Sequence, residues 1–145
     1  MRVDFYQLSR DPAEALVPLL ARNTLAAEQR LLVVSADDRQ LKRIDTALWE
    51  ARGEAFLAHG FAGDRHDARQ PILLSDRADP ANGARFVALA DGAWRGEAEG
   101  FERVFLLFDE AGIDAARGTW RSLGERGEVE RRFWKQDSGK WVEGP

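Results

Sequence analysis

Two short apolar runs without polar alternation constrain the fold of this chain most strongly. They are Leu31-Leu32-Val33-Val34 and Val104-Phe105-Leu106-Leu107-Phe108. A strand with one solvated face alternates apolar and polar residues, whereas an unbroken apolar run is typical of a strand covered on both faces, as in a parallel sheet. Segments with apolar residues at i, i+3 and i+4 lie between such strands. The sequence therefore predicts an α/β fold with a largely parallel sheet.

The predicted elements follow one another without a linker or an internal repeat, which indicates a single domain covering residues 1–145. The expected strands are residues 3–8, 31–34, 71–74, 86–89, 103–108 and, as the final edge strand, 128–135. The expected helices are residues 12–27, 37–53 and 114–126. Residues 60–70 and 91–100 are predicted to be loops.

Charge is unevenly distributed along the chain. The 21 basic and 25 acidic side chains give a formal net charge of −4, which argues against a protein that coats nucleic acid through bulk positive charge. Residues 117–140 nevertheless hold seven basic and four acidic side chains, a net charge of +3, so the remainder carries −7. A basic segment on an acidic body predicts a local contact with an anionic partner.

The sequence contains no phosphate loop and no recognisable catalytic group. The first strand-to-helix turn, residues 9–12, has no glycine and presents Asp11, so it cannot cradle a pyrophosphate as a G-x-G-x-x-G turn does. The spacing of the two histidines, His59 and His66, does not indicate a metal site, and the chain has no cysteine. We therefore expect no catalytic residue, no metal and no cofactor.

The hydropathy of the chain predicts a soluble protein. No stretch approaches the roughly 20 apolar residues that a membrane-spanning helix needs. Asp4 lies where a secretory signal would need its apolar core. We expect a cytoplasmic protein without membrane contact.

The last predicted helix carries residues suited to an anionic ligand with an apolar part. Arg117 and Arg121 are four positions apart and share one helix face, and Trp120 lies at the border of that face. Guanidinium groups pair with carboxylates in a fork geometry and stack on rings, so these side chains suit a ligand that is both acidic and aromatic. The alternative is that Trp120 belongs to the core and both arginines are only solvated.

A second group of aromatic residues surrounds the second predicted helix. Trp49 is one position away from the apolar stripe of that helix, and Phe56 follows in the next segment. Tryptophan is enriched in interface hot spots, so this surface is a candidate contact for another protein. Nearby His59 has no nucleophile pattern beside it and is more typical of a structural histidine than of a catalytic base.

Segments along almost the whole chain, taken in order, resemble the chi subunit of bacterial DNA polymerase III, an accessory member of the clamp-loader assembly. The matching segments are Phe5-Tyr6-Gln7-Leu8, Leu41 to Trp49, Phe56-Leu57-Ala58-His59, Phe101 to Phe108, and Ala116-Arg117-x-x-Trp120-Arg121. No single segment is specific, but the ordered set is. The resemblance implies a single-domain, Rossmann-like three-layer fold with a mostly parallel sheet and no catalytic activity.

The resemblance also implies a peptide-binding site. The family docks the acidic C-terminal tail of single-stranded-DNA-binding protein, which ends in Pro-Phe. Arg117 falls where the family's essential arginine contacts that tail, and Trp120 falls where an aromatic residue lines the pocket. Arg121 falls where a second basic residue sits, and Phe108 matches an apolar wall residue. DNA itself would be contacted only indirectly.

A second partner is implied for the other aromatic group. Trp49, Phe56 and His59 fall on the surface that the family uses for its psi subunit, and a helicase is a further candidate for that surface. The chain departs from the family at Ala58, where proline is usual, and in a shorter turn between Asp109 and Arg117.

Two other functions remain open from the sequence. One is a nucleotide-binding enzyme of Rossmann type with a degenerate phosphate loop, against which the missing glycine turn counts. The other is direct binding of nucleic acid by the basic C-terminal edge that carries Trp134.

Overall fold

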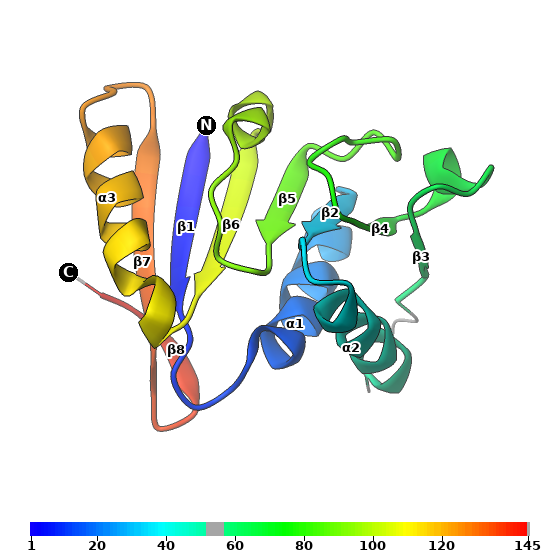
Figure 1. The fold of residues 1–145 in the computed structure, drawn as a ribbon, viewed down its shortest axis with the longest axis horizontal. Helices are drawn as coiled ribbons and strands as arrows, with labels where there is room; N and C mark the ends of the chain where they lie inside the picture. Colours follow the sequence, from blue (N-terminus) through cyan, green and yellow to red (C-terminus); the bar gives the residue numbers. More distant parts are fainter. Residues whose placement is uncertain (52–56, 145) are drawn as a thin grey trace.

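An eight-stranded sheet forms the centre of the described part of the chain, which comprises residues 1–51 and 57–144 of a computed structural model (Figure 1). The strands are β1 (Arg2–Gln7), β2 (Leu31–Val34), β3 (His59–Phe61), β4 (Ile72–Ser75), β5 (Phe86–Leu89), β6 (Arg103–Phe108), β7 (Glu130–Asp137) and β8 (Lys140–Glu143). Their order across the sheet is β3-β4-β2-β5-β6-β1-β7-β8, and every neighbouring pair is parallel except β7 and β8. The predicted α/β fold with a mostly parallel sheet is confirmed.

Helices cover both faces of the sheet and give the protein three layers. The helices α1 (Ala13–Ala26) and α2 (Asp38–Glu50) pack together on one face, and α3 (Ile113–Gly124) lies on the other, next to β7 (Figure 1). Successive side chains of a strand point to opposite faces of the sheet. Tyr6 therefore belongs to the core under α1 and α2, and Phe5 belongs to the core under α3. The Rossmann-like, single-domain arrangement expected from the sequence is confirmed.

The two apolar runs are buried on both faces, as their lack of alternation predicts. Residues 31–34 of β2 have no exposed surface, and residues 104–108 of β6 are at most 5% exposed. Burying one such side chain contributes about 1.5–3 kcal/mol relative to leaving it in water. These central strands therefore hold the helical layers on both sides of the sheet.

The prediction that residues 128–135 form the final edge strand is wrong. β7 lies between β1 and β8, so β8 occupies the edge. Ser138 and Gly139 join the two strands with positive φ angles of 53° and 81°, as in a two-residue type I′ hairpin turn. Ser-Gly is a weaker turn signal than Asn-Gly, and β8 has only four residues. The sequence pattern therefore does not predict this hairpin.

The segment after α2 also differs from the prediction. Residues 59–61 form β3, an edge strand paired with β4, although the polar loop was expected to begin at Gly60. Three residues that include a glycine are too few to show a period of two. The second helix ends at Glu50, with Ala51 as its C-cap. The expected end at Gly53 lies outside the described residues.

Candidate functional site

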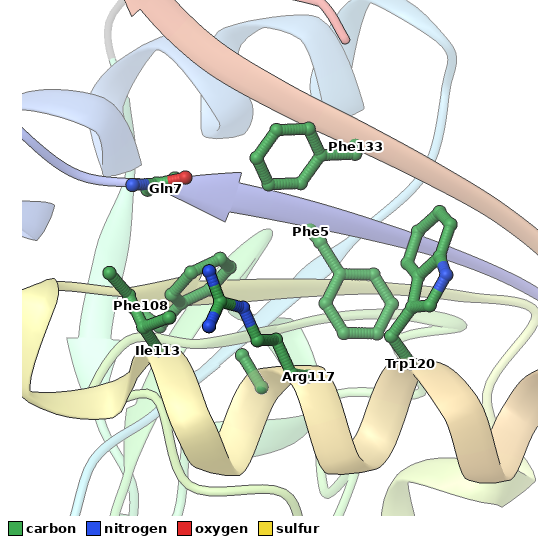
Figure 2. A pocket seen from close by; sticks show the side chains of 8 residues that line it. Phe5, Gln7, Phe108, Ile113, Arg117, Trp120 and Phe133 are labelled. Carbon is green, nitrogen blue, oxygen red and sulfur yellow. The ribbon is translucent and has the colours of Figure 1, made fainter. Parts of the chain in front are cut away.

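A hollow of about 250 Å³, here named the α3 pocket, lies between α3 and the strands of the sheet (Figure 2). It is lined by Phe5, Gln7, Phe108, Ile113, Ala116, Arg117, Trp120 and Phe133. All of these residues are apolar or aromatic except Gln7 and Arg117. An apolar hollow with a few placed polar groups is the usual composition of a ligand site.

Helix α3 supplies one wall of the α3 pocket because four of its residues share a face. Ile113, Ala116, Arg117 and Trp120 follow the spacing i, i+3, i+4 and i+7, which aligns them along one side of a helix. Ala116 is buried against the sheet, and its small side chain keeps the helix close to the strands without filling the hollow. The wall is therefore a direct product of the helical spacing.

Arg117 brings a charge that the protein itself hardly neutralises. Its side chain is 69% exposed, and its guanidinium lies 3.9 Å from the fully exposed carboxylate of Asp114. An exposed pair at this distance contributes little, on the order of 0–1 kcal/mol. Figure 2 shows the Arg117 side chain extending from α3 toward β1, over the floor of the pocket. The guanidinium is thus available to a carboxylate of a ligand.

Trp120 forms a fixed wall of the pocket. Its ring meets Phe5 edge-on, with 5.0 Å between ring centroids and an interplanar angle of 74°. The guanidinium carbon of Arg131 lies 4.3 Å from the centroid of the indole, and Arg131 Nη1 donates a 2.8 Å hydrogen bond to the Trp120 carbonyl oxygen. A Cβ at Gly124 would lie 2.5 Å from Arg131 Nη1, so the glycine leaves the space that the arginine occupies.

Strand residues form the floor of the pocket. Phe5 and Gln7 lie on the side of β1 that faces α3, Phe108 ends β6, and Phe133 lies on β7. The register places Phe5 beside Phe133 and Gln7 beside Phe108. Parallel strands in register present neighbouring side chains on one face, so these four residues meet although they come from distant parts of the sequence.

Three of the four predicted tail-binding residues lie together in the α3 pocket. These are Phe108, Arg117 and Trp120, whereas Arg121 is exposed on the following turn and does not line the hollow. The alternative that Trp120 is a core residue holds in part, because its ring is half-buried against Phe5. The remaining lining residues were not assigned to this site from the sequence: Ile113 and Ala116 belong to the expected inward stripe of the helix, and Phe5, Gln7 and Phe133 come from the strands.

The second predicted group lies near the other edge of the sheet. Trp49 is 59% exposed, and its ring centroid is 4.9 Å from that of His59. The His59 side chain is 1% exposed, with Nδ1 2.8 Å from the Leu57 carbonyl oxygen and Nε2 2.7 Å from an Asp45 carboxylate oxygen. His59 therefore supports Trp49 from the interior and does not itself face solvent. Phe56 lies outside the described residues.

The first strand-to-helix turn is occupied by a side chain of the protein. The backbone amides of Arg10 and Asp11 each donate to Gln136 Oε1 at 3.2 Å, and Gln136 Nε2 donates to the Asp11 carboxylate at 2.8 Å. Backbone amides at this turn are the groups that bind phosphate in nucleotide folds. Gln136 thus engages the donors that a nucleotide would require.

Trp134, which lies on the face opposite the α3 pocket, is held by its neighbours. Its ring stacks on Tyr6 with 5.9 Å between centroids and 10° between planes, and its Nε1 donates to the buried Asp4 at 2.9 Å. Burial, together with the charge of Asp4, raises the pKa of Tyr6 to about 12. On the same strand, Arg132 is paired with Glu130 at 2.8 Å. A nucleobase could therefore not stack on the face of the Trp134 ring that Tyr6 covers.

Two further features are absent from residues 1–51 and 57–144. No three acidic or histidine side chains of that part converge to hold a metal ion. No helix in it has the length and apolar character needed to cross a membrane.

The fold and the pocket define a Rossmann-like α/β domain without a phosphate loop. The family described as "DNA polymerase III chi subunit, HolC" matches residues 1–130. The Pseudomonas aeruginosa protein named DNA polymerase III subunit chi is 33% identical over 131 residues, which cover 87% of this chain and 91% of the relative. The Escherichia coli K12 protein of the same name is 30% identical over 78 residues, which cover 49% and 53%. The chain therefore belongs to the DNA polymerase III chi-subunit family, an accessory, non-catalytic component of the replication machinery.

Proposed function

We propose that this protein is a cytoplasmic adaptor of the DNA polymerase III holoenzyme that binds the acidic C-terminal tail of single-stranded-DNA-binding protein in the α3 pocket. A second protein surface links it to the clamp loader. The single observation that carries the proposal is the presence of an exposed, weakly paired guanidinium, that of Arg117, beside an apolar hollow. Membership in the chi-subunit family supports the replication role.

The tail has an apolar C-terminal side chain and acidic groups, and the α3 pocket has a complementary feature for each of them. An apolar C-terminal phenylalanine gains from leaving water, and the aromatic walls Phe108 and Trp120 offer it edge and face contacts. A carboxylate of the tail forms charge-assisted hydrogen bonds with Arg117. Arg121, one turn further along α3 and exposed, attracts the acidic run from the rim.

The second surface is assigned to the region of Trp49, supported by His59 and expected to include Phe56. Its partner is a psi subunit or another clamp-loader component, and a helicase is the other candidate. An exposed tryptophan packed on a buried, hydrogen-bonded histidine is a preorganised anchor of the kind found in interface hot spots. DNA is contacted only indirectly, through the coated strand.

Specific contacts disfavour the two alternative functions. A nucleotide-binding enzyme would need the first-turn amides that Gln136 engages. Direct stacking of nucleic acid at the C-terminal edge is disfavoured because Tyr6 covers one face of the Trp134 ring and Asp4 anchors its Nε1.

The proposal is tested by calorimetric titration with a synthetic tail peptide that has an acidic run before a C-terminal Pro-Phe. Arg117→Ala should weaken binding by about 2 kcal/mol, roughly 30-fold, because a desolvated arginine anchor is removed. Arg121→Ala should cost less and should mainly reduce the salt dependence. A peptide without its final phenylalanine should fail to bind. Equal affinity of wild type and Arg117→Ala would refute the assignment of the pocket.

A further inference from the structure

One row of side chains continues the floor of the α3 pocket toward the edge of the sheet. Gln7 is in register with Phe108 on one side and with Lys135 on the other, and Lys135 is in register with Val142 of β8. Residues in register point to the same face of a sheet. Because Gln7 and Phe108 line the pocket, Lys135 and Val142 lie on that same face, beyond the pocket.

Lys135 is an unneutralised cation at this position. Its side chain is exposed and forms no hydrogen bond or ion pair with residues 1–51 or 57–144. By contrast, Lys42 on α2 pairs with Asp38 at 3.3 Å. The nearest acid on the same face of β7 is Asp137, which is in register with a second lysine, Lys140. Lys135, one strand beyond the lining residue Gln7, thus adds a cation on the sheet side of the α3 pocket to that of Arg117 on the helix.

We propose that Lys135 is a second anion-binding residue of the α3 pocket, which receives an acidic side chain of the bound tail as the peptide crosses β1 and β7 toward β8. This proposal rests on the proposed function and specifies the path of the ligand. The family match ends at residue 130, so Lys135 lies beyond it.

The geometry sets which acidic residue of the tail is bound. Neighbouring strands are about 4.8 Å apart, so Lys135 lies two spacings, about 10 Å, across the sheet from Phe108. An extended peptide advances about 3.3 Å per residue. A tail whose terminal aromatic residue fills the hollow therefore presents a side chain to Lys135 about three residues before its end. The competing path runs along α3 toward Arg121.

The test combines single substitutions in the protein with single Asp→Asn changes in the synthetic tail peptide, with affinities measured by fluorescence anisotropy. Lys135→Ala should weaken binding by about threefold to fivefold, as expected for one exposed ion pair. Lys135→Gln, which keeps most of the stem, should weaken it equally. Lys42→Ala, which removes the same charge from the opposite face, should leave the affinity unchanged.

A double-mutant cycle identifies the contact. The effect of Lys135→Ala should disappear for one peptide variant, with the aspartate about three residues from the end replaced, and persist for the others. Coupling of that aspartate to Arg121 instead, or wild-type affinity for Lys135→Ala while Arg117→Ala binds weakly, overturns the path but leaves the proposed function intact. If the wild-type protein does not bind the peptide, the proposed function fails and this proposal fails with it.

Discussion

The α3 pocket and the surface around Trp49 are both built on a tryptophan, but the two rings are used in opposite ways. Trp120 is clamped between Phe5 and Arg131 and forms the side of a hollow. Trp49 rests on His59 and leaves 59% of its surface exposed on α2. Under the proposed function, one region would accept a side chain from its partner, whereas the other would offer a side chain to its partner.

This difference leads to an expected shape for each proposed partner. A hollow with a charge at its mouth selects a chain end, because only an end can bring a terminal aromatic group and a carboxylate together. A protruding indole requires a partner with a groove of its own. The strands β4, β2 and β5 separate the two regions across the sheet, so they have no shared contact residues and should respond independently.

The largest expected effect is the loss of tail binding on charge reversal in the pocket. Arg117→Glu should reduce affinity for the tail peptide by more than about 100-fold, since it removes the arginine anchor and adds repulsion of the acidic run. The melting temperature should not change, because the Arg117 side chain is 69% exposed and only weakly paired. Anisotropy and thermal unfolding measure the two quantities. Retained binding would mean that Arg117 is merely a solvated surface charge.

The next effect concerns the support of Trp49. Asp45→Ala removes the partner of His59 Nε2 and should lower the free energy of unfolding by about 1–2 kcal/mol, because a buried polar atom loses its hydrogen bond. Asp45→Asn keeps an acceptor at that position and should cost less. Chemical denaturation measures both, and tail affinity should stay constant. A coupled loss of tail binding in the folded variant would show that the two regions are not independent.

A smaller effect tests the clamp on Trp120. Gly124→Ala places a methyl group where Arg131 Nη1 lies, so the guanidinium should leave the indole and tail affinity should fall by about threefold. Gly118→Ala is the matched control, because a Cβ there meets nothing within 4 Å. The control should stabilise α3 by up to about 1 kcal/mol and leave affinity unchanged. Equal affinities of the two variants would show that the clamp does not shape the pocket.

The smallest expected effect is that of Trp49→Ala on the tail site. Distant sites add within about 0.3–0.5 kcal/mol, so the affinity for the tail peptide should change by less than about twofold. The same variant should lose binding to a clamp-loader partner in a pull-down. Loss of tail binding by a folded Trp49→Ala protein would contradict the two-surface arrangement.

Local patterns in the sequence were sufficient to predict what each element contributes by itself. The unbroken runs at residues 31–34 and 104–108 predicted buried parallel strands, and the helical spacing brought Arg117 and Trp120 to one face. The role of Phe108 as a wall residue came instead from the family resemblance, not from a local pattern. The local predictions succeeded because burial on two faces and a 3.6-residue period are written within a few neighbouring residues.

What could not be predicted depends on the pairing of distant strands. Phe5, Gln7 and Phe133 meet only because β1 is inserted between β6 and β7, and no local pattern specifies that order. Arg121 shares its helix face with Arg117 in sequence spacing, yet the pocket ends before reaching it. The short strands β3 and β8 carry too few residues for a periodic signal.

The insertion of β1 between β6 and β7 also has a consequence for the timing of biosynthesis. The first strand emerges from the ribosome with neither of its neighbours made, and β7 is supplied only near the end of the chain. Sheet closure must then wait for a contact of high sequence separation, which slows folding. Nascent and prematurely terminated chains therefore lack the Phe133 wall of the α3 pocket, so under the proposed function they would not compete with finished molecules for the tail.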